Sequence, residues 1–148
     1  MNPRLVSALI ALFVTTGCGD SPEPVVVDRD SAMGKVTRQS IEAHVVFLAD
    51  EIGERNVSQR PRELAEAVNY IESIFTQAGL EVERHAYDVS GTTCYNLFAE
   101  VRGTTRPDDI VVIGAHYDSA LGCPAANDNG TGVSGVLCLA EKFVGRPC

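Results

Sequence analysis

The residues best suited to chemistry in this 148-residue sequence gather in two short segments. Residues 114–119 have the sequence GAHYDS, with His116 and Asp118 two positions apart. In an extended chain, side chains two positions apart point to the same side. A carboxylate there can accept a hydrogen bond from one ring nitrogen and leave the other nitrogen free for a metal ion. The pair predicts either a metal site or a plain His–Asp contact in a loop after a strand.

The second segment, residues 126–132, has the sequence ANDNGTG and contains Asp128. Asp-Asn-Gly before a helix is a typical turn, and Asp is a favoured N-cap whose side chain accepts backbone N–H bonds. A carboxylate that bridges two cations can occupy a comparable position. Asp128 alone is therefore compatible with capping and with metal binding.

Taken together, the two segments resemble metallopeptidase family 28. That family comprises co-catalytic di-zinc aminopeptidases, with relatives that include carboxypeptidases and glutaminyl cyclases. The resemblance rests on GAHYDS, on the twelve positions from His116 to Asp128, and on NDNGTGVSG at the start of a helix rich in small residues. It extends over residues 37–145, where FLADEIGER, NYI, AGL, YNL and VRGT are also similar to the family.

The resemblance implies a role for each matching residue. His116 corresponds to a zinc ligand, Asp118 to the catalytic-site carboxylate that orients this histidine, and Asp128 to the carboxylate that bridges two Zn²⁺ ions, two per complete site. It also implies a cis or strained peptide bond between Asp128 and Asn129. The substrate would be a peptide, attacked by a water that the metal pair makes nucleophilic near neutral pH.

The family also needs residues that this sequence does not supply in the expected places. These are a Glu-Glu pair with the general base, a further carboxylate ligand and a second histidine. Glu141 is the only acid after Asp128 and is expected several turns into a helix, so it is not predicted to be the base. His44 and His85 are expected on a helix face and an edge strand, away from the metal.

We therefore expect the N-terminal part of a zinc-dependent exopeptidase, similar to an aminopeptidase and inactive by itself. Two alternatives stay open: a glutaminyl-cyclase-like acyltransferase with similar ligands, and a non-catalytic lipoprotein that keeps the peptidase scaffold for binding.

The elements that must position these residues follow from periodicity. Apolar residues at helical spacing predict helices over 37–52 and 61–78, and small residues open a third helix near 129–143. Strands are predicted over 81–89 and 94–102, joined as a hairpin at Gly91, and over 109–115, which should be buried on both faces. This order indicates an α/β fold with a mixed sheet. The resemblance implies an incomplete three-layer αβα sandwich of the phosphorylase/hydrolase-like zinc peptidase type.

The N-terminus differs from the rest of the chain. Residues 1–17 combine Arg4, a short apolar run and small residues before Cys18, as in the export signal of a lipoprotein. The run is too short to span a bilayer. Residues 18–34 are predicted to be a flexible tether and residues 35–148 the peptidase domain. The protein is thus expected to be exported, either secreted or attached to the cell envelope by a lipid on Cys18.

Charge and cysteine content set further bounds. A net charge of −8 argues against a nucleic-acid partner, because phosphate binding needs clustered Lys and Arg. Export would permit disulfides, and the four cysteines after Cys18 allow three complete pairings. The sequence does not choose among these pairings, nor does it indicate an oligomeric state. The four are Cys94, Cys123, Cys138 and Cys148.

Overall fold

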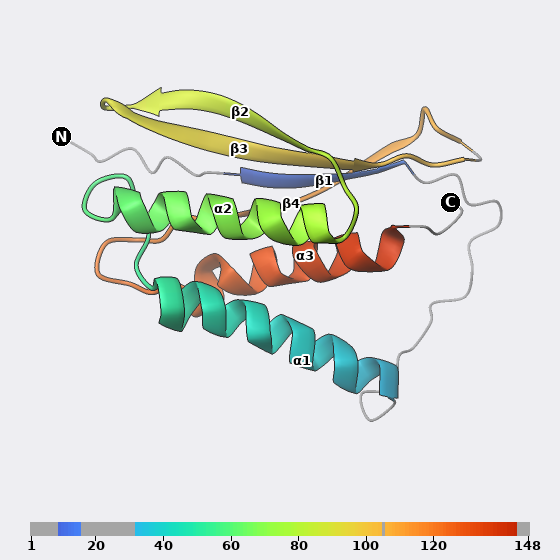
Figure 1. The fold of residues 1–148 in the computed structure, drawn as a ribbon, viewed down its shortest axis with the longest axis horizontal. Coiled ribbons are helices and arrows are strands. Elements are labelled where there is room, and N and C mark those ends of the chain that lie inside the picture. The colour runs from blue at the N-terminus through green and yellow to red at the C-terminus, as the bar shows by residue number, and fades with distance from the viewer. Residues whose placement is uncertain (1–8, 16–31, 105, 145–148) are drawn as a thin grey trace.

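The computed structural model describes residues 9–15, 32–104 and 106–144 (Figure 1). The elements follow in the order β1 (Leu9–Thr15), α1 (Ala32–Val46), η1 (Phe47–Ile52), α2 (Pro61–Gln77), β2 (Val82–Val89), β3 (Thr92–Val101), β4 (Ile110–His116), η2 (Ala126–Gly130) and α3 (Thr131–Phe143). The predicted sequence of two helices, three strands and a helix is confirmed from α1 onward. β1 is an additional strand.

The four strands form one mixed sheet in the order β2-β3-β1-β4. β2 and β3 are antiparallel, β1 is parallel to β3, and β1 is antiparallel to β4. The predicted hairpin is confirmed, because Val89 pairs with Thr92 across a loop of only Ser90 and Gly91. These two residues have φ of 53° and 85°. Positive φ at both loop positions is typical of the turn whose twist matches a tight hairpin.

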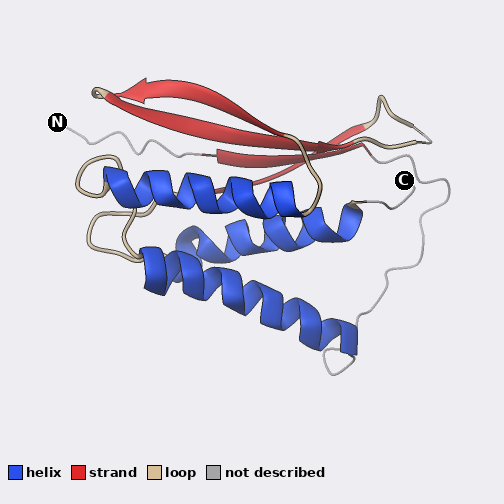
Figure 2. Cartoon of the chain, in the orientation of Figure 1, coloured by secondary structure: helices blue, strands red, loops and turns tan. Residues whose placement is uncertain are grey.

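The helices of the described chain lie on one side of the sheet (Figures 1 and 2). α2 packs against β2 and β3, α3 packs against β1 and β4, and α1 packs against α3. The α/β class with a mixed sheet is confirmed. The described residues form two layers, so the third layer of the predicted three-layer sandwich is not among them.

The core lies between the sheet and the helices. α2 begins with Pro61 in its first turn and turns its predicted apolar stripe toward the sheet. Burying one such side chain contributes about 1.5–3 kcal/mol. Side chains with no solvent exposure include Leu48, Ile71, Phe75, Leu97, Val133 and Leu137.

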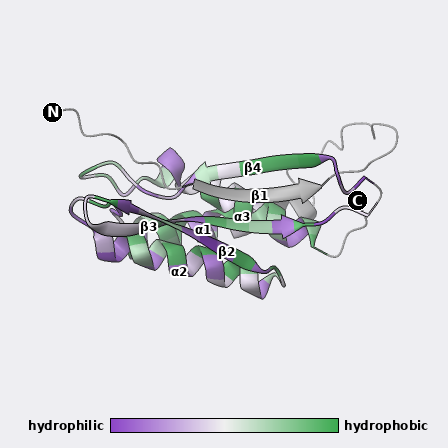
Figure 3. Ribbon diagram, turned by 90° about the horizontal axis from the view of Figure 1, so that it is seen from above, coloured by the Kyte–Doolittle hydropathy of each residue, from purple (hydrophilic) through white to green (hydrophobic). Residues whose placement is uncertain are grey.

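The prediction that residues 109–115 are buried on both faces is wrong. Ile110, Val111 and Val112 at the start of β4 are 63%, 42% and 57% exposed. β4 is an edge strand, and the helices cover only one face of the sheet, so apolar side chains on the other face meet solvent. Figure 3 shows this hydrophobic strand at the sheet edge. Burial is reached only near the end of β4, where Ala115 is 4% exposed.

The N-terminal predictions fall largely on residues outside the described ranges. Cys18 and residues 19–31 lie outside them, and β1 lies within the predicted export signal, whose removal stays a prediction. Within the described part, no helix is long and apolar enough to cross a membrane. Cys94, Cys123 and Cys138 carry free thiols, and Cys148 is outside the described residues.

Candidate metal centre

β4 delivers His116 and Asp118 to the same side of the chain. Tyr117 lies between these two residues and Ser119 follows them. Both are buried, with 0% and 6% of their surface exposed. The Tyr117 hydroxyl donates a 2.6 Å hydrogen bond to the carbonyl of Tyr95 on β3. Because the backbone alternates, anchoring Tyr117 and Ser119 inward turns His116 and Asp118 the other way. Burial raises the pKa of Tyr117, so its hydroxyl stays a neutral donor.

The three sequence-predicted site residues come together. His116 Nδ1 lies 3.2 Å from Asp118 Oδ1, and His116 Nε2 lies 2.9 Å from Asp128 Oδ1. The imidazole therefore stands between two carboxylates, one on each ring nitrogen. The three side chains therefore lie next to one another. Their roles as ligands and orienting group stay predictions.

The separation of the two candidate ligand atoms can be compared with the geometry of a zinc ion. Zinc bonds to imidazole nitrogen and carboxylate oxygen are about 2.0–2.2 Å long, so two ligands of a tetrahedral ion lie roughly 3.3 Å apart. The observed 2.9 Å between His116 Nε2 and Asp128 Oδ1 is slightly shorter. One imidazole nitrogen and one carboxylate oxygen are also donors that zinc prefers. In the described chain, no group of three or more His, Cys, Asp or Glu side chains could hold a metal ion.

The segment that carries Asp128 has an unusual backbone. The Asp128–Asn129 peptide bond is cis, as predicted. The side chain of Asn129, rather than Asp128, accepts the hydrogen bond from the backbone N–H of Gly132 at 3.0 Å. The cap at the start of α3 therefore belongs to Asn129. Asp128 is 85% exposed at its side chain and directed toward His116.

Two of the three glycines at the start of α3 and just before it have close neighbours where a Cβ would stand. A Cβ on Gly132 would collide with the Asn129 side chain, and one on Gly130 would lie 3.0 Å from the carbonyl of Ala125. A Cβ on Gly135 would meet nothing within 4 Å. Gly132 therefore leaves room for the capping side chain next to Asp128.

The contribution of the loop between η1 and α2 was not predicted from the sequence. In this loop Arg55 is fully buried and contacts the segments on both sides of the candidate centre. Burial lowers the pKa of its guanidinium, and the charge of Asp118 opposes that shift. Arginine is usually exposed, so composition could not reveal this burial. The only indication was that residues 47–55 resemble the family.

Glu54 ties the same loop to the segment after β4. Its Oε1 accepts hydrogen bonds from the backbone N–H of Gly122 at 2.9 Å and from Asn56 Nδ2 at 2.8 Å. These hydrogen bonds, the one from Gly122 first, lower the pKa of Glu54.

The other histidines are engaged elsewhere. His44 Nδ1 lies 2.6 Å from the Tyr70 hydroxyl between α1 and α2, and burial lowers its pKa. His85 is on β2, where its ring lies 4.4 Å from that of Phe98 and its Nε2 is 3.2 Å from Glu83. Glu141 lies within α3, as expected.

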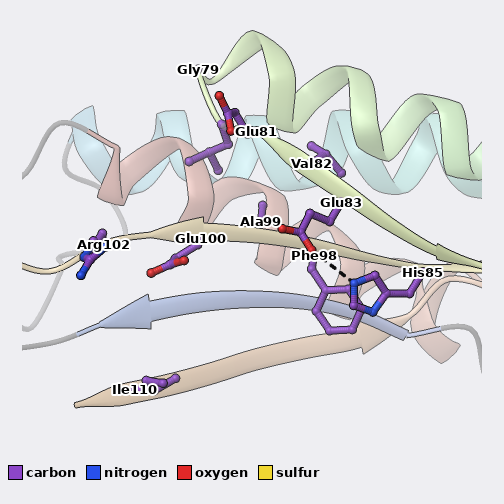
Figure 4. Close-up of a pocket in the computed structure, with 11 residues that line it drawn as sticks. Gly79, Glu81, Val82, Glu83, His85, Phe98, Ala99, Glu100, Arg102 and Ile110 are labelled. Carbon is purple, nitrogen blue, oxygen red and sulfur yellow. Dashed lines mark hydrogen bonds and ion pairs between the residues drawn. The ribbon is translucent and has the colours of Figure 1, made fainter. Parts of the chain in front are cut away.

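A pocket of about 750 Å³ lies near the other end of β4 (Figure 4). Its walls include Ile110, the first residue of β4, whereas His116 is the last. At about 3.4 Å per residue, the strand separates the two by roughly 20 Å. The pocket is therefore not the site that His116 and Asp128 form. It is lined by residues of β2 and β3 that include Val82, Glu83, His85, Phe98 and Glu100.

Comparison with known proteins bears directly on the segment that holds these residues. Residues 96–147, which include His116, Asp118 and Asp128, match the model of peptidase family M28. Over these residues the chain is similar to peptidase family M28. No solved structure matches this chain.

Curated proteins are also similar to this chain. An uncharacterized protein of Escherichia coli K12, YfbL, is 29% identical over 111 residues, which cover 70% of this chain and 33% of that protein. Leupeptin-inactivating enzyme 1 of Streptomyces exfoliatus is 27% identical over 139 residues, covering 88% and 31%. An aminopeptidase of Pseudomonas aeruginosa is 43% identical over 49 residues, covering 33% and 9%. The chain spans about a third of the length of the first two relatives.

Proposed function

We propose that this chain supplies part of the metal site of an exported zinc-dependent exopeptidase of the aminopeptidase kind. The observation that carries the proposal is the convergence of His116 Nε2 and Asp128 Oδ1 at 2.9 Å, with Asp118 on the opposite ring nitrogen. The M28 match over this segment and the relatives named as aminopeptidases support it. The substrate class is a peptide.

Each residue has a distinct task in this proposal. Asp118 accepts a hydrogen bond from the N–H at Nδ1 of His116. This fixes the tautomer and leaves the lone pair of Nε2 for a metal. Asp128, whose carboxylate faces Nε2, would hold zinc as the carboxylate ligand that the two ions share. Zinc, when bound, polarises the scissile carbonyl and lowers the pKa of a coordinated water.

A complete co-catalytic metal pair needs more ligands than these three residues provide, and it also needs a general base. We therefore propose that the 148-residue chain binds zinc weakly and does not hydrolyse peptides by itself. Activity would require the further ligands that the family uses.

Zinc titration tests the site. The affinity of the chain for Zn²⁺ can be measured at pH 7.5 by competition with a chromophoric chelator. His116→Ala and Asp128→Ala are expected to lower the affinity at least roughly tenfold, because each removes a ligand. His85→Ala is the matched control, since it removes an exposed histidine on β2. If the chain binds no zinc, or both variants bind it as the wild type does, the proposal fails.

We further propose that the chain is exported and attached to the cell envelope by a lipid on Cys18. The short apolar run before Cys18 supports this localisation. Cys18→Ala should move the product from the membrane fraction to the soluble fraction after cell lysis. An unchanged distribution would remove the lipid anchor from the proposal.

A further inference from the structure

The side chain of Arg55 lies in the interior between the two segments that carry the candidate ligands. It has no solvent exposure. Its guanidinium donates hydrogen bonds to five main-chain carbonyls: Nε to Tyr117 at 2.6 Å, Nη1 to Leu48 at 2.9 Å, to Gly53 at 2.9 Å and to Pro124 at 2.7 Å, and Nη2 to Ala125 at 3.3 Å. A single planar group thus connects three stretches of chain.

Two of these stretches hold the candidate ligands. Tyr117 stands between His116 and Asp118, and Ala125 stands three positions before Asp128. The backbone of Arg55 reinforces the first connection. Its carbonyl accepts from the N–H of Ser119 at 2.8 Å, and its N–H donates to the Ser119 hydroxyl at 2.9 Å. Arg55 is therefore hydrogen-bonded to both segments that carry the candidate ligands, and it links their positions.

The backbone at Ala125 shows why such a connection is needed. Ala125 has a φ of 54°, a left-handed conformation that residues with a Cβ rarely adopt. Such conformations persist only where the surrounding structure enforces them. Here the carbonyl of Ala125 accepts from Arg55 Nη2 and, at 3.0 Å, from the N–H of Gly130. Arg55 and Gly130 together hold the turn that leads into Asp128.

We propose that Arg55 is a positioning residue of the metal site, which sets the separation of His116 and Asp128 through Tyr117 and Ala125. This inference rests on the proposed function. Arg55 touches neither ligand side chain in the contacts above and acts through the backbone. Lysine cannot replace it, because an ammonium group has three donors and lacks the planar fork that reaches separate carbonyls.

The first test measures metal binding by the full chain. Arg55→Lys keeps the charge and is expected to lower Zn²⁺ affinity about 10–100-fold, as loss of a group that orients ligands does. The absorption bands of bound Co²⁺ should weaken or shift, because they report ligand geometry. Phe75→Leu is the control: it alters a buried core residue on α2 and should keep the wild-type affinity and bands. All variants are compared at a temperature where circular dichroism shows them folded.

The second test needs no metal. Amide hydrogen exchange of the metal-free chain is expected to become roughly tenfold faster in residues 119–130 of Arg55→Lys, the effect of losing about one hydrogen bond. Exchange in α2 should stay as in the wild type. Phe75→Leu should produce the reverse pattern, with faster exchange in α2.

The two tests separate the two proposals. If the wild type binds zinc but Arg55→Lys binds it equally well, or if Phe75→Leu loses as much affinity, Arg55 does not position the site. A uniform rise in exchange along the chain also overturns the inference. If the wild type binds no zinc while residues 119–130 loosen in Arg55→Lys, the zinc proposal fails and Arg55 still organises the two segments.

Discussion

At the scale of single residues, Gly132 leaves room for the side chain of Asn129, which is next to Asp128 of the candidate centre. Asn129 caps α3 through the N–H of Gly132, and the cap occupies the place that a Cβ on Gly132 would need. A methyl group there would push the Asn129 side chain away and remove the cap. Asp128 is the neighbour of Asn129, so the change would also reach the candidate ligand.

This predicts a contrast between two glycines of the same helix. Gly135→Ala is expected to stabilise the chain by about 0.5–1 kcal/mol, because alanine favours the helix and its Cβ meets no atom within 4 Å. Gly132→Ala should be less stable than Gly135→Ala by about 1 kcal/mol, the usual cost of a lost cap. Urea unfolding of both variants measures the difference. Equal stability would mean that the Asn129 cap contributes nothing.

At the scale of elements, a helix or strand could be predicted from the sequence where its own residues determine it. The α2 stripe follows from helical periodicity and its start from Pro61, and the β2–β3 hairpin follows from Gly91 between two strand patterns. Both elements were found. The connection is shorter than predicted, because Thr92 and Thr93 belong to β3. Likewise, the spacing of His116 and Asp118 placed both on one side of the chain, which the 3.2 Å contact confirms.

The predictions that failed concern burial, which an element acquires from the elements packed against it. The apolar run of β4 predicts a strand correctly, but whether both faces are covered depends on helices that the strand sequence does not contain. Ile110 is exposed because only one face of the sheet is covered. Arg55 was missed for the same reason. Its partners are carbonyls up to 70 positions away, and carbonyls have no sequence signature.

At the scale of the whole molecule, His44 links helices that are far apart in the sequence. It lies on α1, its Nδ1 is 2.6 Å from the hydroxyl of Tyr70 on α2, and the charge of Glu141 on α3 acts on it. Burial lowers the pKa of His44 from 6.5, and the carboxylate of Glu141 only partly opposes this shift. The packing of the three helices therefore favours a neutral imidazole.

The stability of the chain should consequently depend on pH. Well above pH 6.5, His44 is neutral in both the folded and the unfolded chain, so it contributes no pH dependence there. As the pH falls through 6.5, the unfolded chain binds a proton that the folded chain does not, until the lowered pKa is reached. In that window the free energy of unfolding decreases, with a slope of at most about 1.4 kcal/mol per pH unit from this group.

His44→Gln keeps a polar side chain near Tyr70 but does not titrate, so its free energy of unfolding should fall less between pH 7.5 and 5. Urea unfolding at several pH values measures both slopes, with His85→Gln as the control for removing one histidine. If the wild type and His44→Gln lose stability in parallel, burial of a neutral His44 does not couple the three helices to pH.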